Sequence, residues 1–96
     1  MYYVYILTNK TNNVLYIGMT NDILRRITEH KSDMIDGFTK RYHVHKLVYF
    51  EEYSSSTEAI NREKQLKGYK RYKKVDLINQ MNSDWDDLSE DLYWYA

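Results

Sequence analysis

The chain of 96 residues contains no cysteine and no proline, and only three glycines. Without cysteine it can form neither a disulfide nor a thiolate metal site, and it has no catalytic thiol. Its apolar runs reach about six residues, far short of the ~20 that a membrane-spanning helix needs. No basic stretch followed by an apolar segment opens the chain, so a secretory leader is not indicated. We therefore expect one domain with a modest core, reduced and cytoplasmic, with no membrane partner.

The net charge is zero, with fourteen basic and fourteen acidic residues, but the charges are unevenly distributed. Five of the acids fall within 84–91, which leaves nine acids against fourteen basic residues in 1–83. The sequence thus predicts a basic domain over 1–83 and an acidic, aromatic tail or short helix over 84–96. Such a division suits nucleic-acid binding that the tail weakens by competition. The alternatives are a solvated basic helix face with a solubilising terminus, or a tail packed as a helix.

Patterns of β-branched and aromatic residues predict three strands, over 2–7, 14–19 and 46–51. The polar cluster 9–13 predicts an antiparallel hairpin between the first two strands, and a loop is expected around Gly37. The expected helices run from a cap at Asn21 or Asp22 to about Lys31, from a capping box at Ser55 and Glu58 to near Gly68, and over 72–81. The order β-β-α-β-α-α predicts the α/β (α+β) class, with a small three-stranded, mainly antiparallel sheet flanked by helices.

Two tyrosines are expected on one surface of the hairpin. Side chains alternate along a strand, so Tyr5 and Tyr16 border the same surface if the hairpin pairs in its natural register. Gly18 would let a backbone or a phosphate approach there. The alternative is that these tyrosines serve only as cross-strand packing partners.

The first helix carries Arg26 and His30 four residues apart, and therefore on one face. This places the Arg26 guanidinium at the edge of the apolar stripe, where its donors could hold a phosphate, whereas Arg25 points elsewhere. The alternatives are that Arg26 covers the core with its stem and that His30 is a structural residue at the helix end.

The second helix carries a carboxylate within its apolar stripe, because Glu63 lies between Ile60 and Leu66 at helical spacing. A charge in such a place needs a cation or strong donors. Lys67 offers a simple salt bridge, and the alternatives are a divalent ion or Arg26 across the sheet. The three histidines do not have the spacing of a zinc site.

These residues resemble the GIY-YIG nuclease motif. Tyr3-Val4-Tyr5 and Tyr16-Ile17-Gly18 are similar to its two tripeptides, and Arg26, His30 and Glu63 stand at the family's spacing. The resemblance covers about residues 2–80 and is nearest to the small stand-alone bacterial branch, similar to the nuclease module of a bacterial excision-repair protein. Two features depart from the pattern: the first motif begins with a tyrosine, and the family's asparagine has only Asn79 as a candidate.

The resemblance implies a metal-dependent endonuclease with Mg²⁺ or Mn²⁺ as its cofactor. Glu63 would hold the metal, Arg26 would stabilise charge on the phosphate, Tyr16 or Tyr5 would activate or position water, and His30 would assist proton transfer. Cleavage is expected to follow the structure of the nucleic acid, DNA rather than RNA, in repair or recombination, with a protein partner as a candidate source of specificity. The expected nucleic-acid contacts are Gly18, Arg25, Lys31, Lys40, Arg41, Lys67, Lys70, Arg71, Lys73 and Lys74, with Tyr42, Tyr69 or Tyr72 stacking on an unpaired base.

Two other functions remain open from the sequence. The first is a module that binds nucleic acid but has lost useful activity. The second is a protein-interaction domain that docks a partner through Trp85, Tyr93, Trp94 and Tyr95.

Overall fold

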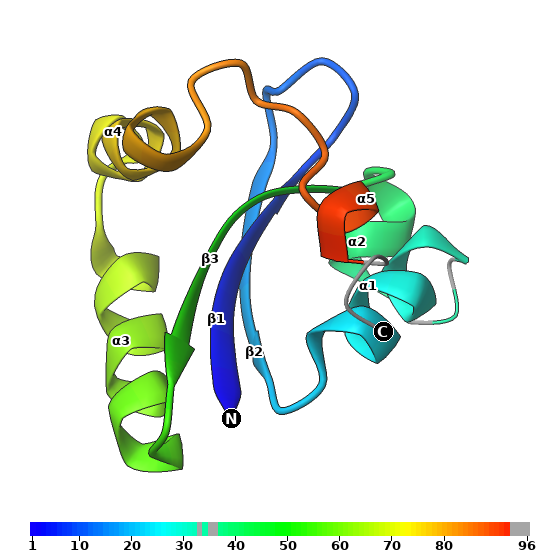
Figure 1. Cartoon of the computed structure of the whole chain (residues 1–96). Helices are drawn as coiled ribbons and strands as arrows, with labels where there is room; N and C mark the ends of the chain where they lie inside the picture. Colours follow the sequence, from blue (N-terminus) through cyan, green and yellow to red (C-terminus); the bar gives the residue numbers. More distant parts are fainter. Residues whose placement is uncertain (33, 35–36, 93–96) are drawn as a thin grey trace.

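A computed structural model describes residues 1–32, 34 and 37–92 of the chain, which form a three-stranded sheet between two groups of helices (Figure 1). The aromatic end of the tail, at 93–96, lies outside these described residues. The elements in chain order are β1 (Tyr2–Thr8), β2 (Leu15–Thr20), α1 (Ile23–Lys31), α2 (Phe38–Arg41), β3 (Lys46–Tyr53), α3 (Ser56–Gly68), α4 (Arg71–Met81) and α5 (Ser89–Leu92). The predicted fold class and element order are confirmed, with α2 and α5 as short additions.

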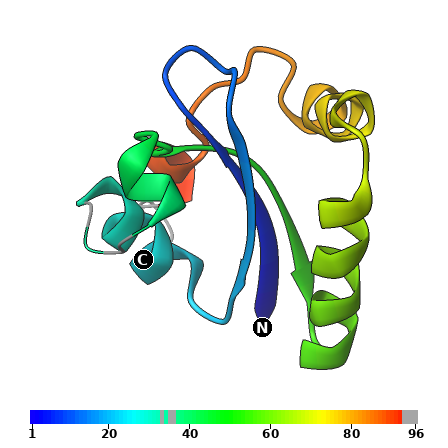
Figure 2. The ribbon, with the colours of Figure 1, turned by 180° about the vertical axis from the view of Figure 1, so that it is seen from behind.

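The sheet is antiparallel throughout, with β1 in the middle of the order β2-β1-β3. The alternation along β1 divides the core in two. Val4 and Ile6 face α3 and α4, whereas Tyr5 and Leu7 face α1 and the segment near α5. Both sides of this central strand are therefore buried, and the two ribbon views show α3 and α4 on one side with α1, α2 and α5 on the other (Figures 1 and 2).

Local signals in the sequence explain where α1 and α3 begin. The Asp22 side chain caps α1 by accepting a hydrogen bond from the Arg25 backbone amide at 3.1 Å. Ser55 caps α3 in the same way through the Glu58 amide. The loop expected around Gly37 contains the four-residue helix α2, which begins after Gly37 with φ 107°. No side-chain cap marks this turn, so a local signal that would predict it is lacking.

The start of the acidic tail packs onto the domain. The Asp87 carboxylate accepts hydrogen bonds from the backbone amides of Leu47 and Ser89, at 3.2 and 3.1 Å, and it forms an ion pair with Lys31. The Leu88 amide donates to the Leu47 carbonyl at 2.8 Å, and the Leu88 side chain packs against the α1 side of the core. This part of the tail therefore covers the start of β3.

Within the described part of the chain, every helix is too short and too polar to cross a membrane.

Candidate active site

The site begins where Tyr5 in β1 pairs with Gly18 in β2. A methyl group at Gly18 would lie 2.4 Å from the Cζ atom of Tyr5, well inside van der Waals contact. The missing side chain therefore admits the Tyr5 ring. Because this ring fills the space above Gly18, the approach of a backbone or a phosphate that the sequence led us to expect there is blocked.

Replacing Gly18 with Ala is expected to displace the Tyr5 ring and to lower the free energy of unfolding by about 1–3 kcal/mol, the usual cost of overpacking. Chemical denaturation measures this change. Gly68→Ala is the matched control, because a methyl group there meets no atom within 4 Å. Equal stability of Gly18→Ala and Gly68→Ala would contradict this interpretation of the hairpin.

A chain of hydrogen bonds leads from Tyr5 into α1 and α2. The Tyr5 Oη and His30 Nε2 atoms share a hydrogen bond at 3.2 Å, and His30 Nδ1 shares another with Thr39 Oγ1 at 3.0 Å. All three side chains are buried. Burial and the nearby Arg26 charge lower the pKa of His30, so its ring is neutral at pH 7. Burial, reinforced by Tyr16, raises the pKa of the Tyr5 phenol above its ordinary value.

Tyr16 occupies the accessible side of this cluster. Its ring lies 6.5 Å from the Tyr5 ring and 5.7 Å from the His30 ring, centroid to centroid. Unlike Tyr5, Tyr16 is only half-buried, and it lines a hollow of about 340 Å³. Of the two tyrosines, Tyr16 is therefore the one whose ring an incoming substrate can meet.

Arg26 and Glu29 bring opposite charges to the same cluster from α1. Both act on the Tyr5 phenol: the Arg26 charge opposes the rise in its pKa and the Glu29 charge adds to it. Arg26 Nε and Glu29 Oε1 are buried and lack hydrogen-bond partners among the described residues. Glu29 Oε1 forms a long ion pair with Arg25 Nε, at 3.9 Å. Buried donors and acceptors of this kind normally find partners, so these two atoms are exceptions within the fold.

Glu63 lies on α3, on the opposite side of the sheet from α1 (Figure 1), and its charge contributes to the raised pKa of Tyr5. The preceding residue, Arg62, anchors α3 to β3 by donating hydrogen bonds to the Glu51 carboxylate, 2.9 Å from Nε and 3.0 Å from Nη2. Glu63 itself is partly exposed, and its Oε1 atom lies 3.4 Å from Lys67 Nζ. The Lys67 salt bridge weighed from the sequence is therefore present.

The Glu63 carboxylate suits a magnesium-like ion. Mg²⁺ usually binds through one or two carboxylates, keeps several waters and takes further oxygens from phosphate. Glu63 offers one such carboxylate, partly exposed and paired with an exposed lysine. Among the described residues no group of three histidine, cysteine, aspartate or glutamate side chains could form a closed metal cage.

The hollow beside Tyr16 lies between α2 and the two later helices. Its walls are aromatic and apolar and are formed by Leu15, Tyr16, Ile17 and Phe38. Two ammonium groups also line it, those of Lys67 and Lys74. The Phe38 ring is stacked against Tyr16, with centroids 6.1 Å apart, and is 47% exposed. Tyr42 follows at 4.7 Å from Phe38 and is also exposed. An aromatic surface therefore runs outward from Tyr16 along α2.

The predicted nucleic-acid contacts differ in their surroundings. Lys67 and Lys74 line the hollow, whereas Lys40 and Lys70 are exposed outside it. Several cations of the set make intramolecular contacts: Arg25 pairs with Glu29, Arg41 lies over the Tyr42 ring, Lys73 lies over the Tyr69 ring, Lys31 pairs with Asp87, and Arg71 donates to the carbonyls of Asn12 and Asn13.

Two of these contacts engage basic side chains that the sequence led us to expect at the nucleic acid. Arg71 holds the β1–β2 loop, with Nη1 and Nη2 at 3.0 and 2.9 Å from two backbone carbonyls. Lys31 is held by Asp87. Asn79, the candidate for the family's asparagine, accepts a hydrogen bond from Trp85 Nε1 at 2.7 Å and serves the C-terminal segment.

Sequence reasoning missed Glu29, Thr39 and Phe38. Glu29 had a usable signal, because it lies three residues after Arg26 and next to His30. Thr39 and Phe38 belong to α2, and their proximity to the site follows only from how that short helix folds back onto α1.

Comparison with known proteins finds a matching family model, similar sequences and a similar solved structure. The family model of the GIY-YIG catalytic domain matches residues 1–76. A UPF0213 protein of Staphylococcus saprophyticus is 35% identical over 79 residues, which cover 82% of this chain and 95% of that protein. A UPF0213 protein of Clostridium perfringens is 39% identical, with 82% and 84% covered. The solution NMR structure of a UPF0213 protein from Bacillus halodurans superposes with a TM-score of 0.57 at 32% identity, covering 91% of this chain and 93% of that one.

Proposed function

Because this chain belongs to the GIY-YIG catalytic domain family, we propose that it is a divalent-metal-dependent endonuclease of the cytoplasm. Family membership implies a nuclease-type function and nucleic-acid binding, and nucleases of this family generally depend on a divalent metal. The observation that carries the proposal is the cluster of Tyr5, Tyr16 and His30 within the matched domain, joined by the Tyr5–His30 hydrogen bond and by ring contacts.

The reaction is the attack of a water oxygen on phosphorus, with departure of the nucleotide oxygen on the opposite side. Arg26 would bind the oxygens of the phosphate as their negative charge grows, through donors of its partly exposed guanidinium. Glu63 would hold the metal, which when bound supplies positive charge to the phosphate and makes water more acidic. Both contributions, from Arg26 and from the metal, depend on positive charges held at fixed positions beside the phosphate.

Tyr16 would position the attacking water, because it is the accessible tyrosine of the pair. Tyr5 is less suited to act as a base, since burial raises the pKa of its phenol and its oxygen is engaged by His30. The neutral His30 ring would instead keep Tyr5 in place over Gly18, with Thr39 fixing the ring from the other side.

The aromatic surface favours recognition of nucleic-acid structure over sequence. Phe38 and Tyr42 present rings that stack on any unpaired base, and the described lining of the hollow beside Tyr16 is aromatic, apolar and cationic, a composition that does not read base edges. DNA with unpaired or branched segments is therefore the proposed substrate, which suits a role in repair or recombination.

Replacing Phe38 with Ala is expected to weaken binding of DNA that has an unpaired strand by about 1–3 kcal/mol, the contribution of one stacked base. Binding of fully paired duplex should change little. Fluorescence anisotropy with both substrates measures the difference, and Met81→Ala, which removes an exposed apolar side chain at the end of α4, serves as control. Equal losses for duplex and unpaired DNA would show that Phe38 does not select unpaired bases.

A second candidate function is a nucleic-acid-binding module with little turnover. It is favoured by one observation, the engagement of Asn79 by Trp85 in place of a role at the site. Cleavage of labelled DNA by wild type and Arg26→Gln separates the two functions. The endonuclease proposal expects cutting that falls by about 10²–10³-fold in the variant, the cost of removing one charge-stabilising donor. Binding without cutting in wild type would favour the module.

A further inference from the structure

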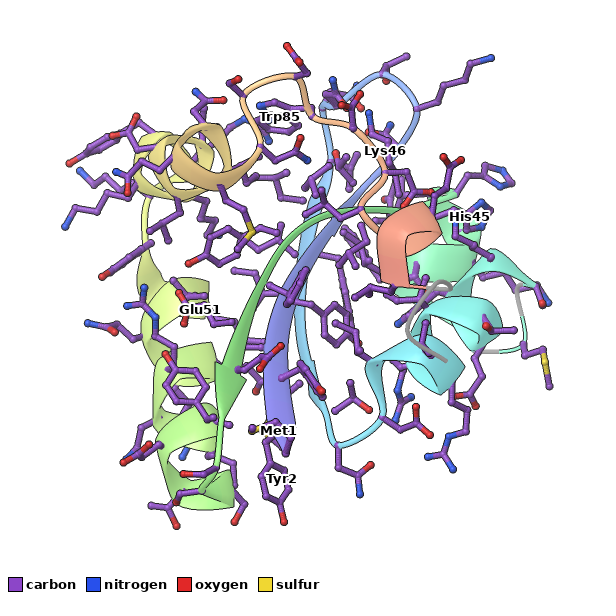
Figure 3. All side chains as sticks on the ribbon, in the orientation of Figure 1. Met1, Tyr2, His45, Lys46, Glu51 and Trp85 are labelled. Carbon is purple, nitrogen blue, oxygen red and sulfur yellow. The ribbon has the colours of Figure 1, made fainter. Side chains whose placement is uncertain are left out.

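A second hollow, of about 520 Å³, shares no lining residue with the hollow beside Tyr16 and is lined by Tyr42 at the end of α2. It forms between the β1–β2 loop, the end of α1, the turn before β3 and the segment before α5. Its lysine, histidine and aspartate lining residues are Lys10, Lys31, His43, His45, Lys46 and Asp87. We call it the hairpin hollow, and Figure 3 labels His45 and Lys46 at its position near α2 and α5.

The hairpin hollow is positively charged. Three ammonium groups and two imidazole rings line it, against the carboxylate of Asp87. This carboxylate is already engaged by Lys31 and by the amides of Leu47 and Ser89. The described lining therefore has an excess of cations and N–H donors, which suits an anion.

The wall formed by the β1–β2 loop is held in place before any ligand binds. Lys46 Nζ donates to Asn12 Oδ1 at 2.6 Å, and Arg71 donates to the carbonyls of Asn12 and Asn13. Within the loop, Asn9 Oδ1 accepts from the Asn13 amide at 3.0 Å. Lys10 stands exposed on this fixed loop. A cation on a fixed loop loses less entropy on binding than one on a mobile loop.

The opposite wall also has a defined shape. His43 adopts a left-handed backbone conformation, with φ 55°, in the turn between α2 and β3. The His43 and His45 rings lie 6.0 Å apart, edge to face. Both rings therefore line the hollow from one short turn that directly follows Tyr42.

The hairpin hollow continues the aromatic surface that begins at the active site. Tyr42 lines the hairpin hollow, its ring lies 4.7 Å from Phe38, and the Phe38 ring lies 6.1 Å from Tyr16. A strand whose bases stack along these rings would carry a flanking phosphate toward Lys10. The ligand that fits the hairpin hollow is therefore the same polyanion that occupies the hollow beside Tyr16, because one aromatic surface joins the two.

We propose that the hairpin hollow is a second phosphate-binding site, in which Lys10, His43 and His45 hold a backbone phosphate of the nucleic acid to one side of the cleaved bond. This proposal rests on the proposed function for the identity of the ligand. It adds Lys10, His43 and His45 to the predicted nucleic-acid contacts. It also extends the path of the substrate along α2 from the hollow beside Tyr16.

Binding of labelled single-stranded DNA by Glu63→Gln protein, in chelator and over a range of salt concentrations, tests the proposal without requiring cleavage. In this background, Lys10→Gln is expected to reduce the slope of log K against log salt by about 0.7, the signature of one lost phosphate contact on a single strand. The double variant His43→Gln with His45→Gln should weaken binding without unfolding the protein, checked by thermal melting. Lys64→Gln, an exposed lysine of α3 that lines neither hollow, is the matched control and should leave the slope unchanged.

An unchanged slope in Lys10→Gln, alongside a reduced slope in Lys67→Gln, would overturn the second phosphate site and leave the endonuclease proposal standing. A Lys10-sensitive slope in a protein whose wild type never cuts DNA would support the site and count against the proposed catalysis. Displacement of the DNA by polyglutamate at equal charge concentration would identify an acidic peptide as the better ligand and overturn the assignment. Absence of any DNA binding would overturn both proposals.

Discussion

Glu63→Gln is expected to lose metal-dependent DNA cutting by about 10³-fold or more, because the substitution removes the negative charge that would hold the cation while keeping the side chain's shape. Single-turnover cleavage at saturating protein measures the loss. The matched control is Glu58→Gln, which neutralises an exposed carboxylate near the start of the same helix. The control should cut at nearly the wild-type rate.

The fold should survive this substitution. The Glu63 carboxylate is partly exposed and pairs with Lys67, whose side chain is 56% exposed, so the ion pair contributes about 0.5 kcal/mol or less. Thermal melting should therefore give nearly the same midpoint for Glu63→Gln and wild type. Cutting that survives in a folded Glu63→Gln protein would show that the metal is held elsewhere.

The two tyrosines are expected to respond differently to loss of their hydroxyl groups. Tyr16→Phe should slow cutting by about 10²-fold or more, because it removes the hydroxyl group that would position the attacking water. Its stability should change little, because the ring is only half-buried and keeps its contacts. Single-turnover rates and denaturation curves for the same protein separate the two effects.

Tyr5→Phe should show mainly as a loss of stability. It leaves the buried His30 Nε2 without its partner, and an unsatisfied buried polar group costs about 1–3 kcal/mol. Its cutting rate should fall less than that of Tyr16→Phe. If Tyr5→Phe remains as stable as wild type and cuts more slowly than Tyr16→Phe, then Tyr5 positions the water and the roles of the two tyrosines are reversed.

The elements that can be predicted from the sequence are those whose signals are local. The strands follow from their residue types, and the helix starts follow from caps that act within three residues, such as Asp22 on Arg25 and Ser55 on Glu58. Helix α4 also begins without a side-chain cap, but its eleven residues give a longer pattern than the four of α2, which offers no comparable signal. The predicted division of the chain at residue 83 stays a prediction, although Asp87 joins the later segment to β3 and α1.

The site was predictable to the extent that it depends on spacing. The register of the hairpin and the helical repeat bring Tyr5, Tyr16 and His30 together, as the sequence indicated. The partners of Arg71 and Lys31 were not predictable, because each is joined to residues more than fifty positions away in the chain. A count of charges in the sequence treats every lysine and arginine as available to bind nucleic acid. In the fold, several of them are held by contacts with other parts of the chain.

The measurement that tests the proposed endonuclease most directly is cleavage of labelled single-stranded, duplex and branched DNA by the wild-type protein, with Mg²⁺ or Mn²⁺ and with chelator. We predict cutting that requires the metal and that favours substrates with unpaired or branched segments. Tight, salt-sensitive binding with no cutting under any of these conditions would contradict the proposed activity.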